Sequence, residues 1–269
     1  MSNPLATPLP WDLVADEYAE FTTPFFANYA RVALDRAGVG AGSRVLDVAC
    51  GPGTLALLAA KRGSHVTAVD FAPAMIQTLA RCAQREAVEV RTHVADGQEL
   101  PMADASYDAA FSMFGLIFFP DRAKGLRELR RVLVPGGVAA IASWQPMERF
   151  RLLADAYTTM RNLLPDLPFG GGKAPLGEAD EVLEEMRAAG FVEVTVEELR
   201  ASAEAESLDE AWSFLCRGSA PFSLVRRTIS DQAWQEVERG ILAALAEKYG
   251  PGQQRLTMVA NLGVGRNPR

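Results

Sequence analysis

The sequence has few of the residues that mark disulfide-rich, metal-binding or secreted proteins. Its three cysteines, Cys50, Cys82 and Cys216, form no C-x-x-C pair, so we expect neither a disulfide framework nor a zinc site, and a reducing compartment is favoured. The first residues lack the basic and apolar segments of a signal peptide, and no apolar run reaches the ~18 residues of a membrane span. We therefore expect a cytoplasmic protein with no membrane span and no bound metal.

Basic residues and histidines are also scarce. The chain has 27 Lys and Arg against 34 Asp and Glu, and its net charge of −7 disfavours a nucleic-acid partner, which needs a basic face. The two histidines, His65 and His93, both lie in predicted strands, and we interpret both as structural. Because no nucleophile–base pair is recognisable either, the sequence identifies no catalytic residue.

What the sequence does contain is a regular alternation of apolar strands and amphipathic helices. Five strands separated by helices predict a parallel sheet whose ligand lies outside the carboxyl ends of the strands. Two further strands extend that sheet, so we predict an α/β fold with a doubly wound, seven-stranded, mostly parallel sheet. The first predicted strand ends near 48. The other six cover 66–70, 88–94, 107–113, 138–144, 192–196 and 255–264.

The length of 269 residues and a hydrophobic content of 49% suffice for one large domain with a full core. Helical patterns at the N-terminus and ahead of the last strand suggest additions to that core. We divide the chain into an N-terminal helical lid (1–40), a ligand-binding core (41–203), a helical cap inserted before the last strand (204–254), and the last strand with the C-terminus (255–269).

Local signals refine this division. Pro24 should break the N-terminal helical region into two helices, and Asp121 should cap a helix. On that helix, Arg127, Arg130 and Arg131 are expected to form the solvated side. The glycine-rich stretch 168–172 is expected to be a flexible loop that could hinge a lid.

The stretch VLDVACGPGT at 45–54 organises the chain, because a buried strand ends there in a glycine turn and a helix follows at once. Such a turn lets backbone approach a ligand closely. Gly51, Gly53 and Ala56 fit the dinucleotide pattern, and Asp70 ends the next strand where a ribose-binding acid is expected, which permits NAD. Asp47 argues instead for S-adenosylmethionine (SAM), because a carboxylate would repel a pyrophosphate and attract the ammonium of a methionine moiety.

Further polar residues follow the other strands. Four segments of the chain, given below, resemble motifs of the class I SAM-dependent methyltransferases, in the branch that includes the ubiquinone- and menaquinone-biosynthesis enzymes. The resemblance implies a Rossmann-like methyltransferase fold. It weakens after Trp144, where the family diverges. The motifs that carry it are VLDVACGPGT (45–54), VDFAPAM (69–75), ADGQELP (95–101) and ELRRVLVPGG (128–137).

The resemblance also implies which residues contact SAM. Asp70 is expected to bind both ribose hydroxyls. Asp47 and the backbone of Ala49, Gly51 and Gly53 are expected to hold the methionine part. The remaining implied contacts are Phe71 and Met75 around the adenine, Asp96 with Gly97 and Gln98 at its amino group, Ser112 and Met113 below the sulfonium, and Tyr18 over the methionine end.

We therefore expect an enzyme that transfers a methyl group from SAM to an O, N or C atom of a small, hydrophobic or aromatic acceptor, leaving S-adenosyl-L-homocysteine. The enzyme would act as a monomer or homodimer. Two alternatives stay open: an NAD(P)-dependent oxidoreductase, and a SAM-binding regulatory or scaffold protein without catalysis. Residues proposed for the acceptor pocket are Trp11, Phe21, Phe25, Phe114, Trp144, Met147, Phe169, Trp212 and Phe214.

Overall fold

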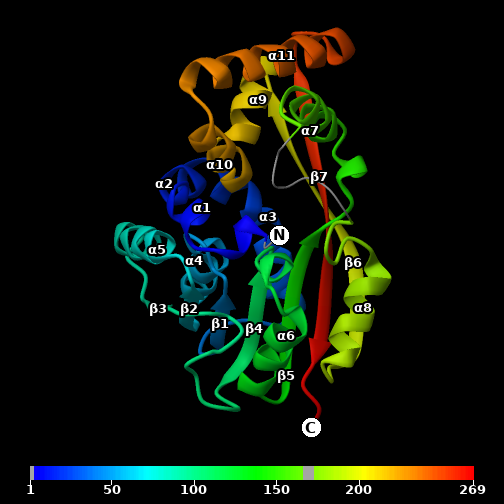
Figure 1. Ribbon diagram of the computed structural model, residues 1–269. Coiled ribbons are helices and arrows are strands. Elements are labelled where there is room, and N and C mark those ends of the chain that lie inside the picture. Colours follow the sequence, from blue (N-terminus) through cyan, green and yellow to red (C-terminus); the bar gives the residue numbers. More distant parts are fainter. Residues whose placement is uncertain (1–2, 166–172) are drawn as a thin grey trace.

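A seven-stranded sheet forms the centre of the computed structural model, which describes residues 3–165 and 173–269 (Figure 1). The strand order is β3-β2-β1-β4-β5-β7-β6. The first five strands pair in parallel, and β7 runs antiparallel to both β5 and β6, which confirms the expected fold class. The strands are β1 (Arg44–Val48), β2 (His65–Asp70), β3 (Val90–Val94), β4 (Tyr107–Met113), β5 (Leu133–Trp144), β6 (Val192–Ala205) and β7 (Gln254–Arg266).

Helices cover both faces of this sheet, and each face has its own apolar core. In β4, Ala109 and Phe111 contribute to one core while Ala110 contributes to the other, as the twofold alternation of a strand requires. The first core is closed by α3 (Thr23–Arg36), α4 (Thr54–Lys61) and α5 (Pro73–Arg85), and the second by α6 (Arg122–Val132) and α8 (Ala179–Ala188).

Two strands, β5 and β6, are longer than the sequence predicts by at least five residues. β5 begins at Leu133, because the Pro-Gly-Gly stretch at 135–137 stays within the strand as an irregularity, with Gly136 at φ +80°. β6 continues to Ala205, because alternating residues beyond 196 still pair with β7. The added parts of β5 and β6 have mainly small and polar side chains that do not alternate with large apolar ones, so the sequence pattern did not indicate them.

The N-terminal region is less regular than the expected pair of helices. Two short helices, α1 (Leu9–Asp12) and α2 (Ala15–Glu17), precede a π-helical turn, η2 (Tyr18–Thr22). Pro24 lies in the first turn of α3, where its missing N–H has no helical partner to lose. The chain therefore changes helical geometry just before Pro24 rather than breaking at it.

The inserted helices α9 (Leu208–Cys216), α10 (Ala220–Thr228) and α11 (Asp231–Tyr249) lie beyond the carboxyl ends of the parallel strands, and α7 (Arg151–Leu163) packs against α11 (Figure 1). These four helices share one apolar core. From here on we call α7 and α9–α11 together the cap, which adds α7 to the segment 204–254 expected from the sequence. Ser207 caps α9 by accepting a hydrogen bond from the backbone N–H of Glu210.

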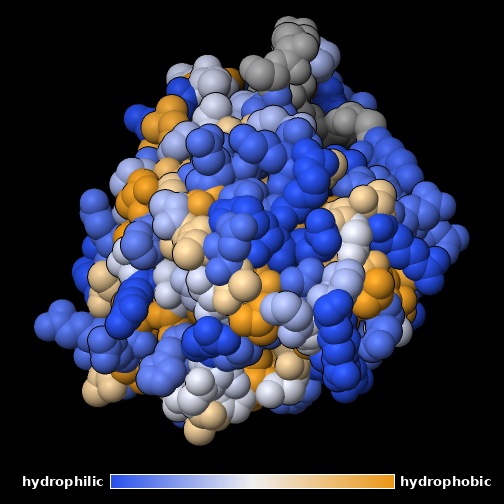
Figure 2. All heavy atoms as spheres, turned by 90° about the horizontal axis from the view of Figure 1, so that it is seen from below, coloured by the Kyte–Doolittle hydropathy of each residue, from blue (hydrophilic) through white to orange (hydrophobic). Residues whose placement is uncertain are grey.

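The opposite face, at the amino ends of the parallel strands, carries mostly charged and polar side chains with apolar ones scattered between them (Figure 2). Arg44 forms an ion pair with Asp108 there, and Arg62 pairs with Asp35. No helix within residues 3–165 and 173–269 is long and apolar enough to cross a membrane. The predicted loop at 168–172 falls outside the described residues.

Candidate functional site between sheet and cap

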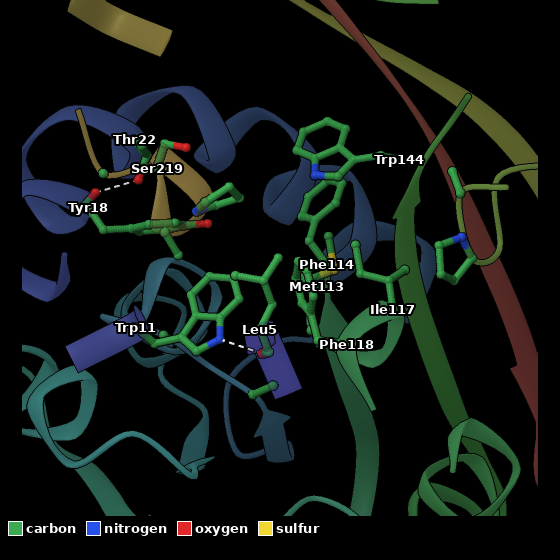
Figure 3. A pocket seen from close by; sticks show the side chains of 18 of the residues that line it. Leu5, Trp11, Tyr18, Thr22, Met113, Phe114, Ile117, Phe118, Trp144 and Ser219 are labelled. Carbon is green, nitrogen blue, oxygen red and sulfur yellow. Dashed lines mark hydrogen bonds between the residues drawn. The ribbon is translucent and has the colours of Figure 1, made fainter. Parts of the chain in front are cut away.

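A cavity of about 1150 Å³ lies between the carboxyl ends of the strands and the cap. Pockets for one small ligand typically measure roughly 300–1,000 Å³, so this volume suits two adjacent ligands. Gly51, Asp70 and Asp96 line it from the sheet. Figure 3 shows Trp144 and Phe114 on one side of it and Tyr18 on another.

The cavity opens where the strand order reverses, between β1 and β4. The two strand ends are conformationally unusual, because Ala49 has φ +54° and Phe114 has φ +65°. Gly115 follows, and a Cβ there would lie only 2.3 Å from the Ala49 Cβ. Strained backbone of this kind concentrates at functional sites. The tight approach of the two loops fixes the cavity floor.

Asp70 ends β2 and is nearly fully buried, with 5% of its surface exposed. Its Oδ2 accepts a hydrogen bond from the Gly51 N–H at 2.8 Å, and its Oδ1 accepts one from the Ala72 N–H at 2.9 Å. Burial raises the pKa of this carboxyl to about 6, although these backbone donors oppose the rise. Asp70 therefore holds the glycine loop against β2 while one side of it borders the cavity.

Asp47 lies deeper, in β1, with 1% of its surface exposed. Oδ2 accepts a hydrogen bond from the Ala56 N–H at 3.1 Å, whereas Oδ1 is buried with no partner within the described residues. Burial raises the pKa of Asp47 to about 8, and the nearby Asp70 carboxylate adds to the rise. A second cavity of about 50 Å³ reaches Asp47 and is also lined by Ala49. An unsatisfied acceptor in such a place suits a cationic or hydrogen-bond-donating ligand group.

The predicted adenine-side residues come together on the cavity wall. They are Phe71, Met75, Asp96, Gly97 and Gln98. Asp96 is exposed and accepts hydrogen bonds from the Gln98 backbone and side chain, and Gln98 Oε1 in turn accepts one from the Asp121 N–H at 2.8 Å. Gly97 has no room for a side chain, since a Cβ would lie 2.4 Å from Phe119.

Two predicted residues lie behind the wall. Ser112 is fully buried, its hydroxyl has no partner within the described residues, and it lines neither cavity, whereas its neighbour Met113 lines both. Gly53 also lines neither cavity. It caps α4 at φ +89°, and a Cβ there would lie 2.1 Å from Leu79 Cδ1, so its place is explained by helix packing.

Tyr18 lines both cavities from the π-helical turn, and burial raises its pKa. The Thr22 hydroxyl donates a hydrogen bond to the Tyr18 carbonyl, drawn in Figure 3. The turn between α9 and α10 reaches this segment at Gly218, where φ is +71° and a Cβ would lie 2.9 Å from Tyr18 Cα. Lid and cap therefore meet backbone to backbone at the cavity, and π-helical turns of this kind are frequent at functional sites.

Aromatic rings form the remaining wall. Phe114 stacks on Trp144 with ring centroids 4.0 Å apart, and Phe26 meets both edge-on, 5.1 Å from Phe114 and 5.5 Å from Trp144. Of the rings proposed from the sequence, Trp11, Phe25, Phe114, Trp144 and Phe214 line the cavity, together with Met147.

The other proposals for this wall differ from what the structure places there. Phe21 stacks under Arg217 and Trp212 donates to Glu238, and neither lines the cavity. Phe169 lies outside the described residues. The lining also includes Phe26, Tyr157 and Phe222, which the sequence did not indicate. Only the three- and four-residue spacing of apolar positions could have indicated them, and that spacing is shared by ordinary core residues.

Arg131 corrects the expected solvated face of α6. It donates to Glu128 and Asp104 and to the carbonyl oxygens of Leu100 and Met102, while Glu128 accepts from the Leu100 N–H. These bonds fasten the long β3–β4 connection that begins with Asp96. The clamp was not recognisable in the sequence, because a helical arginine three residues from a glutamate is usually a surface pair.

The cavity lining offers no catalytic pair. Neither His65 nor His93 lines it, and no group of three or more His, Cys, Asp or Glu in the part of the chain that the structure describes is arranged to hold a metal ion. The arrangement can enclose, orient and desolvate two ligands side by side.

Comparison with known proteins gives a family match over the segment that carries the four sequence motifs. Residues 45–137 match a family model described as a methyltransferase domain. An uncharacterised protein of Mycobacterium tuberculosis is 35% identical over 153 residues, which are 56% of this chain and 56% of that protein. The demethylmenaquinone methyltransferase of Thermus thermophilus is 41% identical over 121 residues, which are 44% of this chain and 55% of that enzyme. The chain spans about half the length of the curated relatives it matches.

Among solved structures, the 4+2 cyclase SpnF is similar over most of the chain. It is 25% identical with a TM-score of 0.55, and the match covers 90% of this chain and 81% of SpnF. The shared fold therefore extends well beyond the segment that the family model matches.

Proposed function

Because the chain belongs to the class I SAM-dependent methyltransferases, we propose that it transfers a methyl group from SAM to an oxygen, nitrogen or carbon atom of a small, hydrophobic or aromatic acceptor. The observation that carries the proposal is the cavity of about 1150 Å³, which joins the wall of Asp70, Phe71 and Asp96 to the wall of Phe114 and Trp144. The sheet side suits a nucleoside and the aromatic side suits a flat apolar molecule.

The residues on the sheet side fit SAM in the following way. The unpartnered Asp47 oxygen would accept a hydrogen bond from the ammonium of the methionine part, directly or through the small cavity. Asp70 would turn its carboxylate to the ribose hydroxyls. Phe71 and Met75 would enclose the adenine, and Asp96 with Gln98 would meet its polar edge.

When bound, SAM supplies a methyl group on a positively charged sulfur, which a nucleophile displaces in line. The chain's own residues would contribute alignment and exclusion of water, which account for much of the barrier reduction in such reactions. Tyr18 and the Arg217–Ser219 turn close the cavity above the glycine loop, and Phe114 with Trp144 fixes the plane of the acceptor. No side chain of this set is assigned as a general base.

The alternatives are less well supported. The unpartnered Asp47 oxygen suits a donor such as the SAM ammonium, and the pyrophosphate of NAD(P) offers no donor to it. A regulatory protein without catalysis would not need an acceptor space, whereas the cavity continues well past the cofactor wall to Tyr157 and Phe222. The likeness to a 4+2 cyclase favours one further candidate, in which the same cavity holds a cyclising substrate, because one fold hosts several reactions.

Calorimetric titration of the purified protein with SAM, S-adenosyl-L-homocysteine and NAD tests the proposal. We expect micromolar binding of the two sulfur nucleosides and none of NAD. Binding of NAD alone would overturn the cofactor assignment. A homocysteine-release assay over a panel of aromatic acceptors then separates methyl transfer from cyclase or regulatory roles, because only methyl transfer consumes SAM.

A further inference from the structure

The cap half of the cavity combines apolar side chains with the polar side chains of Thr158, Arg161, Arg217 and Ser219. α7 presents Leu153 and Tyr157 to the cavity, one turn apart on the same face, and Phe214 and Phe222 face it from α9 and α10. The Tyr157 ring stacks on Phe222 with centroids 5.1 Å apart and planes inclined by 20°. The position of the Tyr157 ring is therefore fixed by packing.

The hydroxyl of Tyr157 differs from the polar groups on three other rings, each of which has a hydrogen-bond partner. Tyr29 donates to the Met258 carbonyl at 2.8 Å, Trp212 donates to Glu238 at 2.8 Å, and Tyr249 donates to Asp155. The Tyr157 hydroxyl forms no hydrogen bond within residues 3–165 and 173–269. Enclosed tyrosine hydroxyls normally find a partner, so a bound molecule is the natural source of this one.

We propose that Tyr157 determines acceptor specificity by donating a hydrogen bond from its phenol O–H to a neutral carbonyl oxygen on a flat, apolar acceptor. The proposal rests on the acceptor role given above to this half of the cavity. Burial raises the pKa of Tyr157, so the phenol keeps its proton and acts as a donor. Among Leu153, Phe214 and Phe222 a neutral carbonyl costs far less to desolvate than a carboxylate, whereas a charged acceptor would be drawn to Arg161 and Arg217 on the same lining.

Two probes of nearly equal shape test this assignment. 2-Acetylnaphthalene carries a carbonyl oxygen where 2-isopropenylnaphthalene carries a CH₂ group. Each is titrated by ligand-observed NMR against the full-length wild type, with saturating S-adenosyl-L-homocysteine. We expect the wild type to bind the carbonyl probe roughly 5- to 10-fold more tightly, which is the usual effect of one neutral hydrogen bond.

Tyr157→Phe keeps the ring on Phe222 and removes only the donor, so it should bind both probes equally. Tyr249→Phe is the matched control, since it removes a phenol in the same cap that does not line the cavity, and it should keep the preference. The proposal is overturned if the wild type binds neither probe or shows no preference, if Tyr157→Phe keeps the preference, or if Tyr249→Phe loses it equally. A parallel titration of S-adenosyl-L-homocysteine and a repeat of the probe titrations without it distinguish a failed cofactor assignment from a failed Tyr157 assignment.

Discussion

The two halves of the cavity are built differently. On the sheet side, the carboxylates of Asp47 and Asp70 are tied to backbone N–H groups of the glycine loop and of the helix starts beside it. On the cap side, stacked rings such as Tyr157 on Phe222 form much of the wall. The contrast teaches that one half presents fixed polar atoms, as the proposed cofactor site requires, while the other presents packed rings whose shape can change without disturbing those atoms.

The largest expected effect concerns Asp47 and pH. Its folded pKa of about 8 exceeds the ordinary value of 3.8, so between these values the folded protein holds a proton that the unfolded chain has released. The free energy of unfolding should therefore fall as pH rises through this window, by about 1.4 kcal/mol per pH unit for this group. Asp47→Asn mimics the protonated form and should flatten the slope in urea unfolding at pH 5, 6, 7 and 8.

Asp108 provides the control for that series. Its pair with Arg44 lowers its pKa, so it stays ionised in both states above pH 5. Asp108→Asn should leave the slope between pH 5 and 8 as it is in the wild type. If Asp47→Asn keeps the wild-type slope, the buried carboxyl is already ionised in the folded protein, and the sheet side of the cavity is less desolvated than the burial of Asp47 indicates.

Removing the Asp70 carboxylate should weaken SAM binding on the sheet side of the cavity. Asp70→Ala deletes the predicted bonds to two ribose hydroxyls, and we expect SAM affinity to fall by roughly 2–4 kcal/mol while the protein stays folded. Calorimetry measures the affinity and circular dichroism the fold. Asp108→Ala, at the other end of the sheet, should bind SAM like the wild type. A folded Asp70→Ala protein with unchanged affinity would contradict the assignment of the site.

The clamp around Arg131 should matter less, but still measurably. Arg131→Ala removes donors to two side chains and two carbonyl groups, so we expect a loss of about 1–3 kcal/mol of unfolding free energy and weaker SAM binding. Thermal unfolding and calorimetry measure the two effects. Arg127→Ala, on the exposed side of the same helix, is the control and should change neither. Equal behaviour of the two variants would mean that the clamp contributes nothing.

The smallest expected effect tests the junction of lid and cap. Gly218→Ala and Gly38→Ala both force a side chain onto positive φ, +71° and +68°, but only at Gly218 does the new Cβ meet Tyr18, at 2.9 Å. Each should lose about 1 kcal/mol through strain, and Gly218→Ala roughly 1 kcal/mol more through the clash. Urea unfolding measures the difference. A difference of zero would show that lid and cap separate freely.

The sequence predicted most of the residues on the sheet side of the cavity, because the motifs that indicate them are local. The strand of 107–113 was predicted with its observed bounds, and the residues after β1, β2 and β3 meet on one cavity wall as parallel strand ends must. The role of each residue toward SAM stays a prediction. Ser112 and Gly53 show the limit of motif reading, because neighbours in a motif divide between the cavity wall and the packing behind it.

The apolar half could not be predicted in the same way. Phe26, Tyr157 and Phe222 come from segments far apart in the chain, and an aromatic at helical spacing looks the same whether it faces a core or a cavity. The clamp of Arg131 also depends on contacts with the distant segment 100–104, which no local pattern encodes.

The hairpin of β6 and β7 has one more consequence. The two strands pair without interruption up to Ala205 and Gln254, so the chain leaves the sheet and re-enters it at adjacent positions. At roughly 3.3 Å per residue, the 14 residues of β6 carry this exit about 45 Å from the start of the strand. The chain between these two residues forms one insertion, and its apolar core is shared with α7. Exchanging the insertion together with α7 between relatives should therefore alter the proposed acceptor half of the cavity and leave the sheet side unchanged.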